Sequence, residues 1–348
     1  MARDDRKLQS NLSLTKFNII IKVIQMRYLN DKNIHELNLD WNNNIKVIAD
    51  ATHCLIANDM AQPIKPYLRY GNNKNRIIAM PAFVGGDINK AGIKWIASFP
   101  ENINKGIARA HSVIILNEAD TGTPVGVINS GAISAIRTAS VSGFIIKEFI
   151  KQRKSQQLKI GIIGFGPIGQ THLAMCNALL GENIESVFVY DIKGVNKELI
   201  PENLKQKVAV VQNWEDAYLD VDVFITCTVS TERYIDKQPK AGSLHLNVSL
   251  RDYKPEVFDW FSKAMIVDDW DEVCRENTDI EMFHKTNGLQ RQNVAQIQTI
   301  QKDNFFDYLD KDQAIMFNPM GMAIFDIAMA NNYLKLALNT NVGVLLDD

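Results

Sequence analysis

Residues 158–191 constrain the fold of this chain more than any other stretch. Residues 158–163 (LKIGII) form a short apolar run that predicts a β-strand, and the glycine-rich sequence GFGPIG follows it directly. A helical pattern then covers residues 170–180, and a second strand-like run, residues 186–190, ends on Asp191. Strand, glycine-rich turn, helix, strand and acid in this order are typical of a dinucleotide-binding βαβ unit.

The glycines of this turn have different predicted roles. Gly164 allows the tight turn, Gly166 lets backbone N–H groups approach a pyrophosphate, and Gly169 lets the helix pack closely on the strand. Pro167 suits the first helical position, where no N–H is needed. The amides of the helix start, together with the helix dipole, favour an anion. We therefore assign the whole turn, including Ile168, to the cofactor site.

The acid at the end of the second strand indicates which dinucleotide is bound. Asp191 lies 22 residues after Gly169, close to where a carboxylate accepts hydrogen bonds from a ribose 2′-hydroxyl. Its charge would repel a 2′-phosphate, and no arginine follows it. We predict NAD as the cofactor, and Lys193 is the feature that keeps NADP as the alternative.

The strand patterns divide the chain into two parts. With 348 residues, of which 46% are hydrophobic, it is long enough for two domains with real cores. After residue 158 strands and helices alternate, which predicts a parallel sheet. Earlier, turn-separated runs look like antiparallel strands: residues 76–81, 91–98, 113–117 and 125–128. The predicted fold class is α/β, with a Rossmann-type doubly wound parallel sheet plus a second α+β domain.

Composition excludes several kinds of partner and site. A net charge of −2 argues against nucleic acid or a membrane surface. The four cysteines form no CxxC pair, which indicates reduced thiols in the cytoplasm. The histidines show no metal-binding spacing, so no metal site is predicted. Residues 1–27 are predicted to be a mobile extension, and residues 277–312, rich in Gln, Asn and charge, a surface excursion with a helix.

Arg137 is the most informative single residue. It is the only charged residue between Asp120 and Lys147, in an otherwise apolar predicted helix, residues 129–150. A buried guanidinium keeps its proton and therefore needs an anion. Either Arg137 holds a ligand carboxylate through a bidentate pair, or it meets a distant structural acid or reaches solvent.

Two further charged residues stand in apolar surroundings. Lys94 lies within a β-like run, where burial would lower its pKa and suit proton transfer; the alternative is a solvated strand face. Asp252 follows the predicted strand 243–250, at the sheet edge where open α/β folds bind ligands; the alternative is a loop residue that caps the next helix. Arg69 and Arg76 could bind anions, although surface arginines are common.

Together these pieces resemble the ornithine cyclodeaminase/μ-crystallin family, from about Tyr28 to Leu338. The family-like stretches are Gly92–Lys94, Ala119–Gly122, Arg137–Ala139, GFGPIG, Thr226–Thr228, Asp252 and Met320–Ala323. Five more stretches are similar to the family's dehydrogenases that release L-2,3-diaminopropionate: QPIKPYLR (62–69), RIIAMP (76–81), VDDW (267–270), CRE (274–276) and NPMGMAI (318–324).

The resemblance implies roles for particular residues. Lys94 and Asp252 match the family's catalytic pair. The implied substrate ligands are Arg69, Arg137, Lys65 and Arg76. The implied cofactor contacts outside the glycine turn and Asp191 are Thr138, Thr226, Cys227, Thr228, Met320 and Gly321. The chain departs from the family at Phe325, where relatives often have Glu. It also lacks the Glu that ornithine cyclodeaminases carry just before the Met-Pro pair, where Ile78 or Ala79 stands instead.

The resemblance also implies a reaction and an assembly. The expected reaction is NAD-dependent oxidative hydrolysis of a glutamate conjugate to L-2,3-diaminopropionate and 2-oxoglutarate, for siderophore or antibiotic synthesis. The alternatives are an ornithine cyclodeaminase-like, alanine dehydrogenase-like or ketimine reductase-like enzyme, and a non-catalytic NAD(P)-dependent binding protein. We expect a homodimer that binds a small amino-acid substrate. Residues 28–136 and 318–348 would form the substrate-binding and dimerisation domain, and residues 137–317 the dinucleotide-binding domain.

Overall fold

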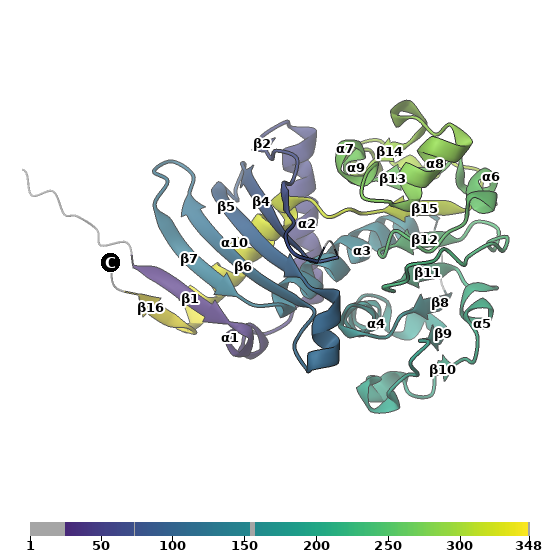
Figure 1. Ribbon diagram of the computed structural model, residues 1–348, viewed down its shortest axis with the longest axis horizontal. Coiled ribbons are helices and arrows are strands. Elements are labelled where there is room, and N and C mark those ends of the chain that lie inside the picture. The colour runs from purple at the N-terminus through teal and green to yellow at the C-terminus, as the bar shows by residue number, and fades with distance from the viewer. Residues whose placement is uncertain (1–24, 73, 154–156, 347–348) are drawn as a thin grey trace, which may run out of the picture.

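The computed structural model describes residues 25–72, 74–153 and 157–346. Figure 1 shows two lobes, each built around one sheet, with helix α3 between them. Both sheets have eight strands. The helices are α1 (Asp31–Glu36), α2 (Trp41–Ile56), α3 (Ala132–Arg153), α4 (Pro167–Leu180), α5 (Trp214–Tyr218), α6 (Phe258–Phe261), α7 (Trp270–Val273), α8 (Asp279–Asn287), α9 (Ile297–Lys302) and α10 (Ala323–Thr340).

The first sheet, called sheet A, has the order β16-β1-β7-β6-β5-β4-β2, and β3 also pairs with β4. It is antiparallel except for the pairing of β1 with β7. Its strands are β1 (Met26–Asn30), β2 (Met60–Ala61), β3 (Tyr67–Leu68), β4 (Arg76–Val84), β5 (Lys90–Ser98), β6 (Ala110–Glu118), β7 (Pro124–Asn129) and β16 (Val344–Leu346). The sheet alternates buried and accessible residues, and its inner face packs on α10.

The second sheet, called sheet B, is parallel throughout, with the order β10-β9-β8-β11-β12-β15-β13-β14. Its strands are β8 (Leu158–Ile163), β9 (Ile184–Tyr190), β10 (Val208–Val210), β11 (Val223–Thr226), β12 (Leu244–Asn247), β13 (Met265–Val267), β14 (Ala295–Gln296) and β15 (Ile315–Asn318). The central strands are buried on both faces, as expected for a doubly wound sheet. The predicted α/β class is confirmed.

One apolar core joins the two lobes. It runs from the inner face of sheet A through α2, α3, α4 and α10 to one face of sheet B. A second core fills the opposite face of sheet B and is rich in aromatic residues such as Tyr218, Phe224 and Phe261. Because α3 and α10 belong to the shared core, the residues they carry are held rigidly between the lobes. In the described part of the chain no helix is both long and apolar enough to cross a membrane.

Two sequence predictions need correction. Residues 277–312 are more than a surface excursion, because β14 extends sheet B and Phe283, Ile297 and Ile300 are buried. Their polar neighbours hid these core positions. Most of the predicted N-terminal extension, residues 1–24, lies outside the described residues. Its last residues belong to β1, where buried Arg27 donates to backbone carbonyls at the end of α10.

Candidate active site

The glycine turn between β8 and α4 has two packed glycines and one open one. Gly164 has a φ of +89°, and a Cβ there would lie 2.5 Å from the Cys227 carbonyl oxygen. A Cβ on Gly169 would lie 2.0 Å from the Gly164 carbonyl oxygen. A Cβ on Gly166, by contrast, would meet nothing within 4 Å, and no side chain caps α4 there. The amides of the helix start therefore face open space, which fits a dinucleotide pyrophosphate.

Two of the other predicted cofactor residues, Asp191 and Cys227, border this turn. Asp191, at the end of β9, accepts hydrogen bonds from Phe165 N (2.7 Å) and Lys193 N (2.8 Å). Burial raises the pKa of the Cys227 thiol, and its Sγ lies 3.8 Å from His172 Nδ1. Cys227 thus borders the turn as a neutral thiol. Thr226 and Thr138 have hydroxyls engaged elsewhere, with Asn247 Oδ1 (3.2 Å) and the Ser134 carbonyl (2.8 Å) respectively.

Adding a methyl group at Gly166 tests whether the glycine turn binds the dinucleotide. Gly166→Ala should fold normally, because its Cβ meets no protein atom within 4 Å, yet the methyl group would occupy the space a pyrophosphate needs. We expect the Kd for NADH, measured by calorimetry, to rise about tenfold or more. Gly131→Ala, another glycine whose Cβ meets nothing within 4 Å, is the matched control and should leave the Kd unchanged. Equal affinities in the two variants would contradict this assignment.

A buried charge cluster, called the Lys94 cluster, joins three elements. Lys94 Nζ, from β5, donates to Asp326 Oδ1 on α10 (2.9 Å) and to Ser134 Oγ on α3 (2.7 Å). Arg137 Nε, one turn further along α3, donates to the same Asp326 oxygen (2.8 Å). Lys94 and Asp326 are each only 1% exposed. The cluster combines two cations with one anion, so it carries a net positive charge suited to a carboxylate.

The cluster settles one open question about Arg137. The distant structural acid exists, and it is Asp326. Only Nε is used for this pair, however, and the two Nη groups bond to no described residue. Asp326 Oδ2 is likewise buried and without a partner among the described residues. Arg137 can therefore hold a ligand carboxylate while it stays paired with Asp326.

Burial and neighbouring charges set the protonation states in this cluster. Burial lowers the pKa of Lys94 to about 8, although Asp326 partly opposes this shift. Burial alone would raise the pKa of Asp326, but Arg137 and Lys94 together hold the pKa of that carboxyl below its ordinary value. An amine that titrates near neutral pH beside a fixed carboxylate is suited to moving protons.

Lys65 extends the cluster toward sheet B. Its Nζ donates to the carbonyls of Gly321 (2.8 Å) and Met320 (3.3 Å) and lies 3.6 Å from a Glu272 oxygen. Burial lowers the pKa of Lys65. Gly321 has a φ of +88°, and a Cβ there would lie 3.0 Å from Arg137 Nη1. The predicted residues Lys65, Met320, Gly321 and Arg137 are thus brought together.

Two predicted substrate arginines lie with Arg275 around Tyr67, and Arg275 joins this group to Lys65 because it donates to the Lys65 carbonyl (3.1 Å) and pairs with Glu272. Arg69 pairs with Glu276. Three guanidinium groups lie near the centre of the Tyr67 ring. The distances are 5.4 Å for Arg69, 5.8 Å for Arg76 and 4.7 Å for Arg275. Three cations therefore surround one aromatic ring, an arrangement stabilised by the ring quadrupole.

Asp252 lies beyond β12 and is fully buried. Thr228 Oγ1 donates to one of its carboxylate oxygens and Ser249 Oγ to the other. Its backbone N donates to Asp279 Oδ2 (3.0 Å). Asp252 caps no helix, so that alternative is wrong. Its carboxylate can reach a ligand only through the Thr228 or Ser249 hydroxyl, or after one of them moves.

A buried polar network beneath Asp252 was not predicted. Asn247 Nδ2 donates to Asp279 Oδ2 (3.0 Å) and Asn318 Oδ1 (2.9 Å), and Arg233 Nε donates to Asp279 Oδ1 (2.7 Å). Asn247 and Asn318 end the adjacent strands β12 and β15. Amide side chains at neighbouring strand ends are the signal that could have revealed this network.

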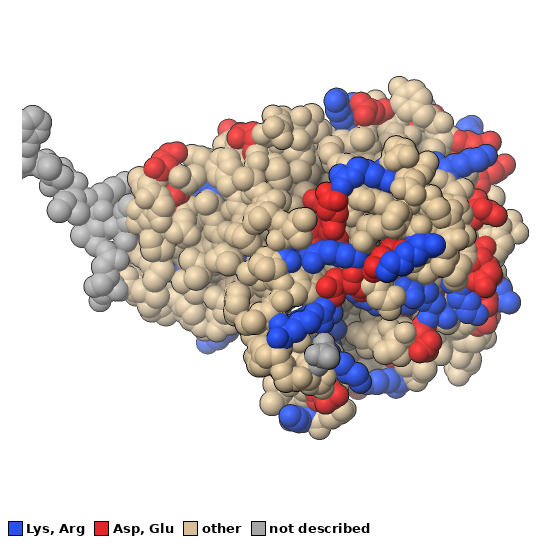
Figure 2. Space-filling model, turned by 45° about the horizontal axis from the view of Figure 1, so that its top comes forward, with Lys and Arg blue, Asp and Glu red and all other residues tan. Residues whose placement is uncertain are grey.

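The site lies where the lobes meet. The glycine turn, Cys227, Asp252 and Met320 all follow the carboxyl ends of sheet B strands, the edge at which such sheets bind ligands. From Met320 the chain runs directly to Gly321, which touches Arg137 of the Lys94 cluster. Figure 2 shows lysine, arginine and acidic side chains gathered along the junction of the lobes.

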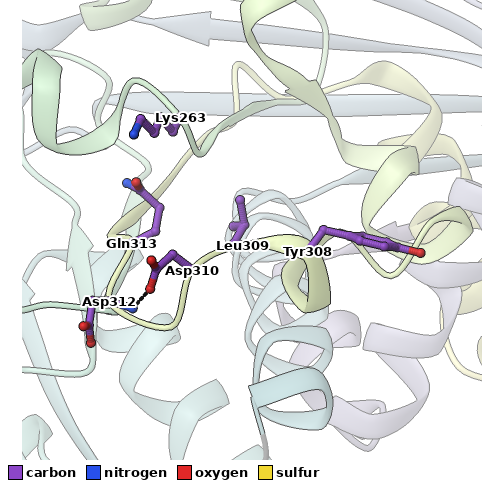
Figure 3. Close-up of a pocket in the computed structure, with 6 residues that line it drawn as sticks. All are labelled: Lys263, Tyr308, Leu309, Asp310, Asp312 and Gln313. Carbon is purple, nitrogen blue, oxygen red and sulfur yellow. Dashed lines mark hydrogen bonds between the residues drawn. The ribbon is translucent and has the colours of Figure 1, made fainter.

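A separate cavity of about 460 Å³ lies at the opposite edge of sheet B. Figure 3 shows its lining side chains, which are Lys263, Tyr308, Leu309, Asp310, Asp312 and Gln313. Lys263 precedes β13 and Gln313 precedes β15, so the cavity faces the amino ends of these strands. It is therefore distinct from the dinucleotide edge.

Comparisons with known proteins agree with this geometry. The profile of the ornithine cyclodeaminase/mu-crystallin family matches residues 34–338. Over 339 residues the chain is 34% identical to N-((2S)-2-amino-2-carboxyethyl)-L-glutamate dehydrogenase of Staphylococcus aureus, with 93% of this chain and 98% of that enzyme covered.

Two solved structures share the architecture. Thermococcus litoralis Delta(1)-pyrroline-2-carboxylate reductase, in complex with NADH and L-proline, has a TM-score of 0.81 at 22% identity, with 92% of this chain and 100% of that chain covered. An archaeal alanine dehydrogenase dimer with bound NAD has a TM-score of 0.78 at 21% identity, with 93% and 99% covered. At such low identity these likenesses establish the fold alone.

Proposed function

The chain belongs to the ornithine cyclodeaminase/mu-crystallin family, and from this premise we propose its reaction. It is an NAD-dependent oxidoreductase that acts on the CH–NH bond of an amino acid. The proposed substrate is N-((2S)-2-amino-2-carboxyethyl)-L-glutamate, which is oxidised and hydrolysed to L-2,3-diaminopropionate and 2-oxoglutarate. The observation that carries the proposal is the 34% identity along 93% of the chain with the Staphylococcus aureus enzyme.

Each residue of the site has a task in this reaction. NAD⁺ supplies the acceptor for the hydride that leaves the glutamate α-carbon. Arg137, through its free Nη groups, would hold the α-carboxylate and orient that carbon. Lys94 in its neutral form would take the proton from the amine nitrogen, which leaves a carbon–nitrogen double bond in the substrate. Asp326 would keep both cations in place.

Hydrolysis of that double bond completes the reaction. Asp252, acting through the Thr228 or Ser249 hydroxyl, would position and deprotonate the water that adds to the carbon. The carbon–nitrogen bond then breaks, the amine leaves with the released protons, and the carbon becomes the ketone of 2-oxoglutarate. The product fits the synthesis of a siderophore or antibiotic in the cytoplasm, where the four cysteines remain the free thiols seen here.

The proposal is tested by incubating the protein with NAD⁺ and candidate amines while absorbance of NADH is followed. We expect NADH and 2-oxoglutarate from the glutamate conjugate. NADH from alanine, proline or ornithine, but none from the conjugate, would instead assign a simpler amino-acid dehydrogenase. The absence of turnover with every amine, despite NADH binding, would point to a binding protein.

We also propose that two copies of the chain associate through the outer face of sheet A, and that this lobe binds the substrate while the other binds the dinucleotide. Trp95 is 43% exposed and Ile115 38% exposed on that face, and Ile115 pairs across the sheet with Ile93 and Val127. Figure 2 shows few charged side chains on this lobe in the view drawn. An apolar sheet face of this kind fits a second copy.

A charged substitution tests this surface. Ile115→Asp should convert a dimer to a monomer in sedimentation analysis, because it places a carboxylate within an apolar contact. Leu199→Asp, at a half-exposed leucine in the other lobe, is the control and should remain dimeric. A monomeric wild-type protein at micromolar concentration, or a dimeric Ile115→Asp variant, would argue against the interface.

A further inference from the structure

Arg76 and Lys94 lie on the same face of sheet A. On β4, Arg76 lies four residues before Met80, and Met80 pairs with Lys94 on the neighbouring strand β5. Side chains at even spacing share a face of a sheet, and four residues span about 13 Å. Two long basic side chains at this separation can hold opposite ends of one amino-acid conjugate. Tyr67, which pairs with Ile78, lies on the same face between them.

Arg76, like Arg109 just before β6 and Arg251 in the loop after β12, makes no ion pair with a carboxylate of the described residues. Arg76 makes no ion pair, and its Nε is buried without a hydrogen-bond partner. Half-buried Arg109 makes no ion pair either. Arg251, also half-buried, donates to the Glu276 carbonyl (2.8 Å) and the Ser249 carbonyl (3.4 Å). Neighbouring cations differ from these, since Arg69 pairs with Glu276.

The three arginines act on one another electrostatically. Burial lowers the pKa of Arg109, and the charge of Arg76 lowers it further. Burial also lowers the pKa of Arg251, again with a contribution from Arg76, and Asp279 and Glu276 partly oppose this shift. Like charges that are partly buried and close together are costly unless an anion joins them. No acid offsets the effect of Arg76 on Arg109, so an anionic ligand would stabilise the positive charge at these two arginines.

A buried hydroxyl lies between the two ends of the face. Ser112, which is 3% exposed, pairs with Ile96, so its row lies between the row of Lys94 and that of Arg76. Its Oγ is buried and bonds to no described residue. A buried hydroxyl without a partner is rare and indicates a missing donor or acceptor. A polar ligand that spans the two rows would supply one.

We propose that Arg76, Arg109 and Arg251 form a second carboxylate subsite. It takes a substrate carboxylate remote from the carbon that loses the hydride, while Arg137 holds the carboxylate on that carbon. The inference rests on the proposed function, because only a conjugate with more than one carboxylate would use both ends. It explains how the site distinguishes such a conjugate from alanine or proline, which have a single carboxylate.

Calorimetric titration in the presence of NADH, where no oxidation occurs, tests the subsite. The ligands are the glutamate conjugate and two analogues, N-(2-aminoethyl)-L-glutamate and N-((2S)-2-amino-2-carboxyethyl)-L-2-aminobutyrate, each lacking one remote carboxylate. We expect the wild-type protein to bind at least one analogue about tenfold more weakly than the conjugate. Arg76→Gln should bind the conjugate about tenfold more weakly and should no longer prefer it to the analogues. Arg109→Gln should reduce this preference for the conjugate.

Arg291→Gln is the control, since Arg291 is half-exposed and pairs with Asp271. It should bind all three ligands as the wild-type protein does. If Arg76→Gln weakens all three equally, or none, the subsite is wrong. Oxidation of the conjugate without any wild-type preference would overturn the subsite alone. A wild-type protein that neither oxidises nor binds the conjugate would overturn the proposed function together with it.

Discussion

Replacing Lys94 with alanine is expected to lower kcat/KM for oxidation of the conjugate by about 10³-fold. The variant loses the group that takes the amine proton and leaves Asp326 paired with Arg137 alone. Lys90→Ala is the matched control, since Lys90 lies on the same strand but pairs with Glu118 (2.9 Å). Steady-state kinetics with saturating NAD⁺ measure both. A Lys94→Ala protein with turnover close to that of the wild type would remove this lysine from the mechanism.

The pH profile gives a second, independent measure of Lys94. Its pKa is lowered to about 8, so the neutral form that accepts a proton predominates only above that pH. The value of kcat/KM should therefore rise with pH and level off above about 8. Lys94→Arg should lack this rise, because a guanidinium does not release its proton in this range. A wild-type profile that falls as the pH passes 8 would show that the protonated amine is the active form.

Asp252→Asn is expected to lower kcat by about 10³-fold while KM changes little. The amide occupies the same space but cannot accept a proton, and the hydroxyls of Thr228 and Ser249 can rotate to suit it. Substrate binding should persist because Arg137 is untouched. Thermal unfolding should show that the variant is folded.

Asp236→Asn is the control for this substitution. Asp236 is a partly exposed acid of the same lobe that pairs with Lys254 (2.6 Å) and is remote in sequence from the glycine turn. It should leave kcat unchanged. An Asp252→Asn enzyme that retains kcat within about threefold of the wild type would assign Asp252 a purely structural role.

Local patterns predicted the nucleotide-binding unit well. Strand β8 has the predicted bounds, and α4 begins at Pro167, within the predicted turn. These features depend on residues close together in sequence, such as Gly169, whose close neighbour is the carbonyl of Gly164 in the same turn. The antiparallel strands were also recognised, because turns separate them and their apolar residues alternate.

The counter-ion of the Lys94 cluster could not be assigned in the same way. Asp326 lies 189 residues from Arg137 and 232 residues from Lys94, and no local pattern pairs groups so far apart. A signal was nevertheless present, because Asp326 is the only charged residue between Ala323 and Leu334. A single charged residue in an apolar helix needs an opposite charge, and this argument applies to Asp326 as it does to Arg137.

The two hydroxyl groups that donate to the Asp252 carboxylate also could not be predicted from the sequence. The residue was expected beside the strand end, and it is there, but its burial depends on Thr228 and Ser249 from two different loops. Serine and threonine are common in loops, and nothing local distinguishes those that reach a particular carboxylate. Asp279, whose carboxylate accepts a hydrogen bond from the Asp252 backbone N–H, lies 27 residues further along the chain.

The position of Asp326 on α10 has a consequence for biosynthesis. A ribosome would deliver Lys94 and Arg137 long before their shared carboxylate. Until α10 emerges, a nascent chain would have two cations destined for burial but would lack the Asp326 carboxylate that pairs with both. This centre therefore cannot close before residue 326 has been synthesised, and any product released before that residue would lack it altogether.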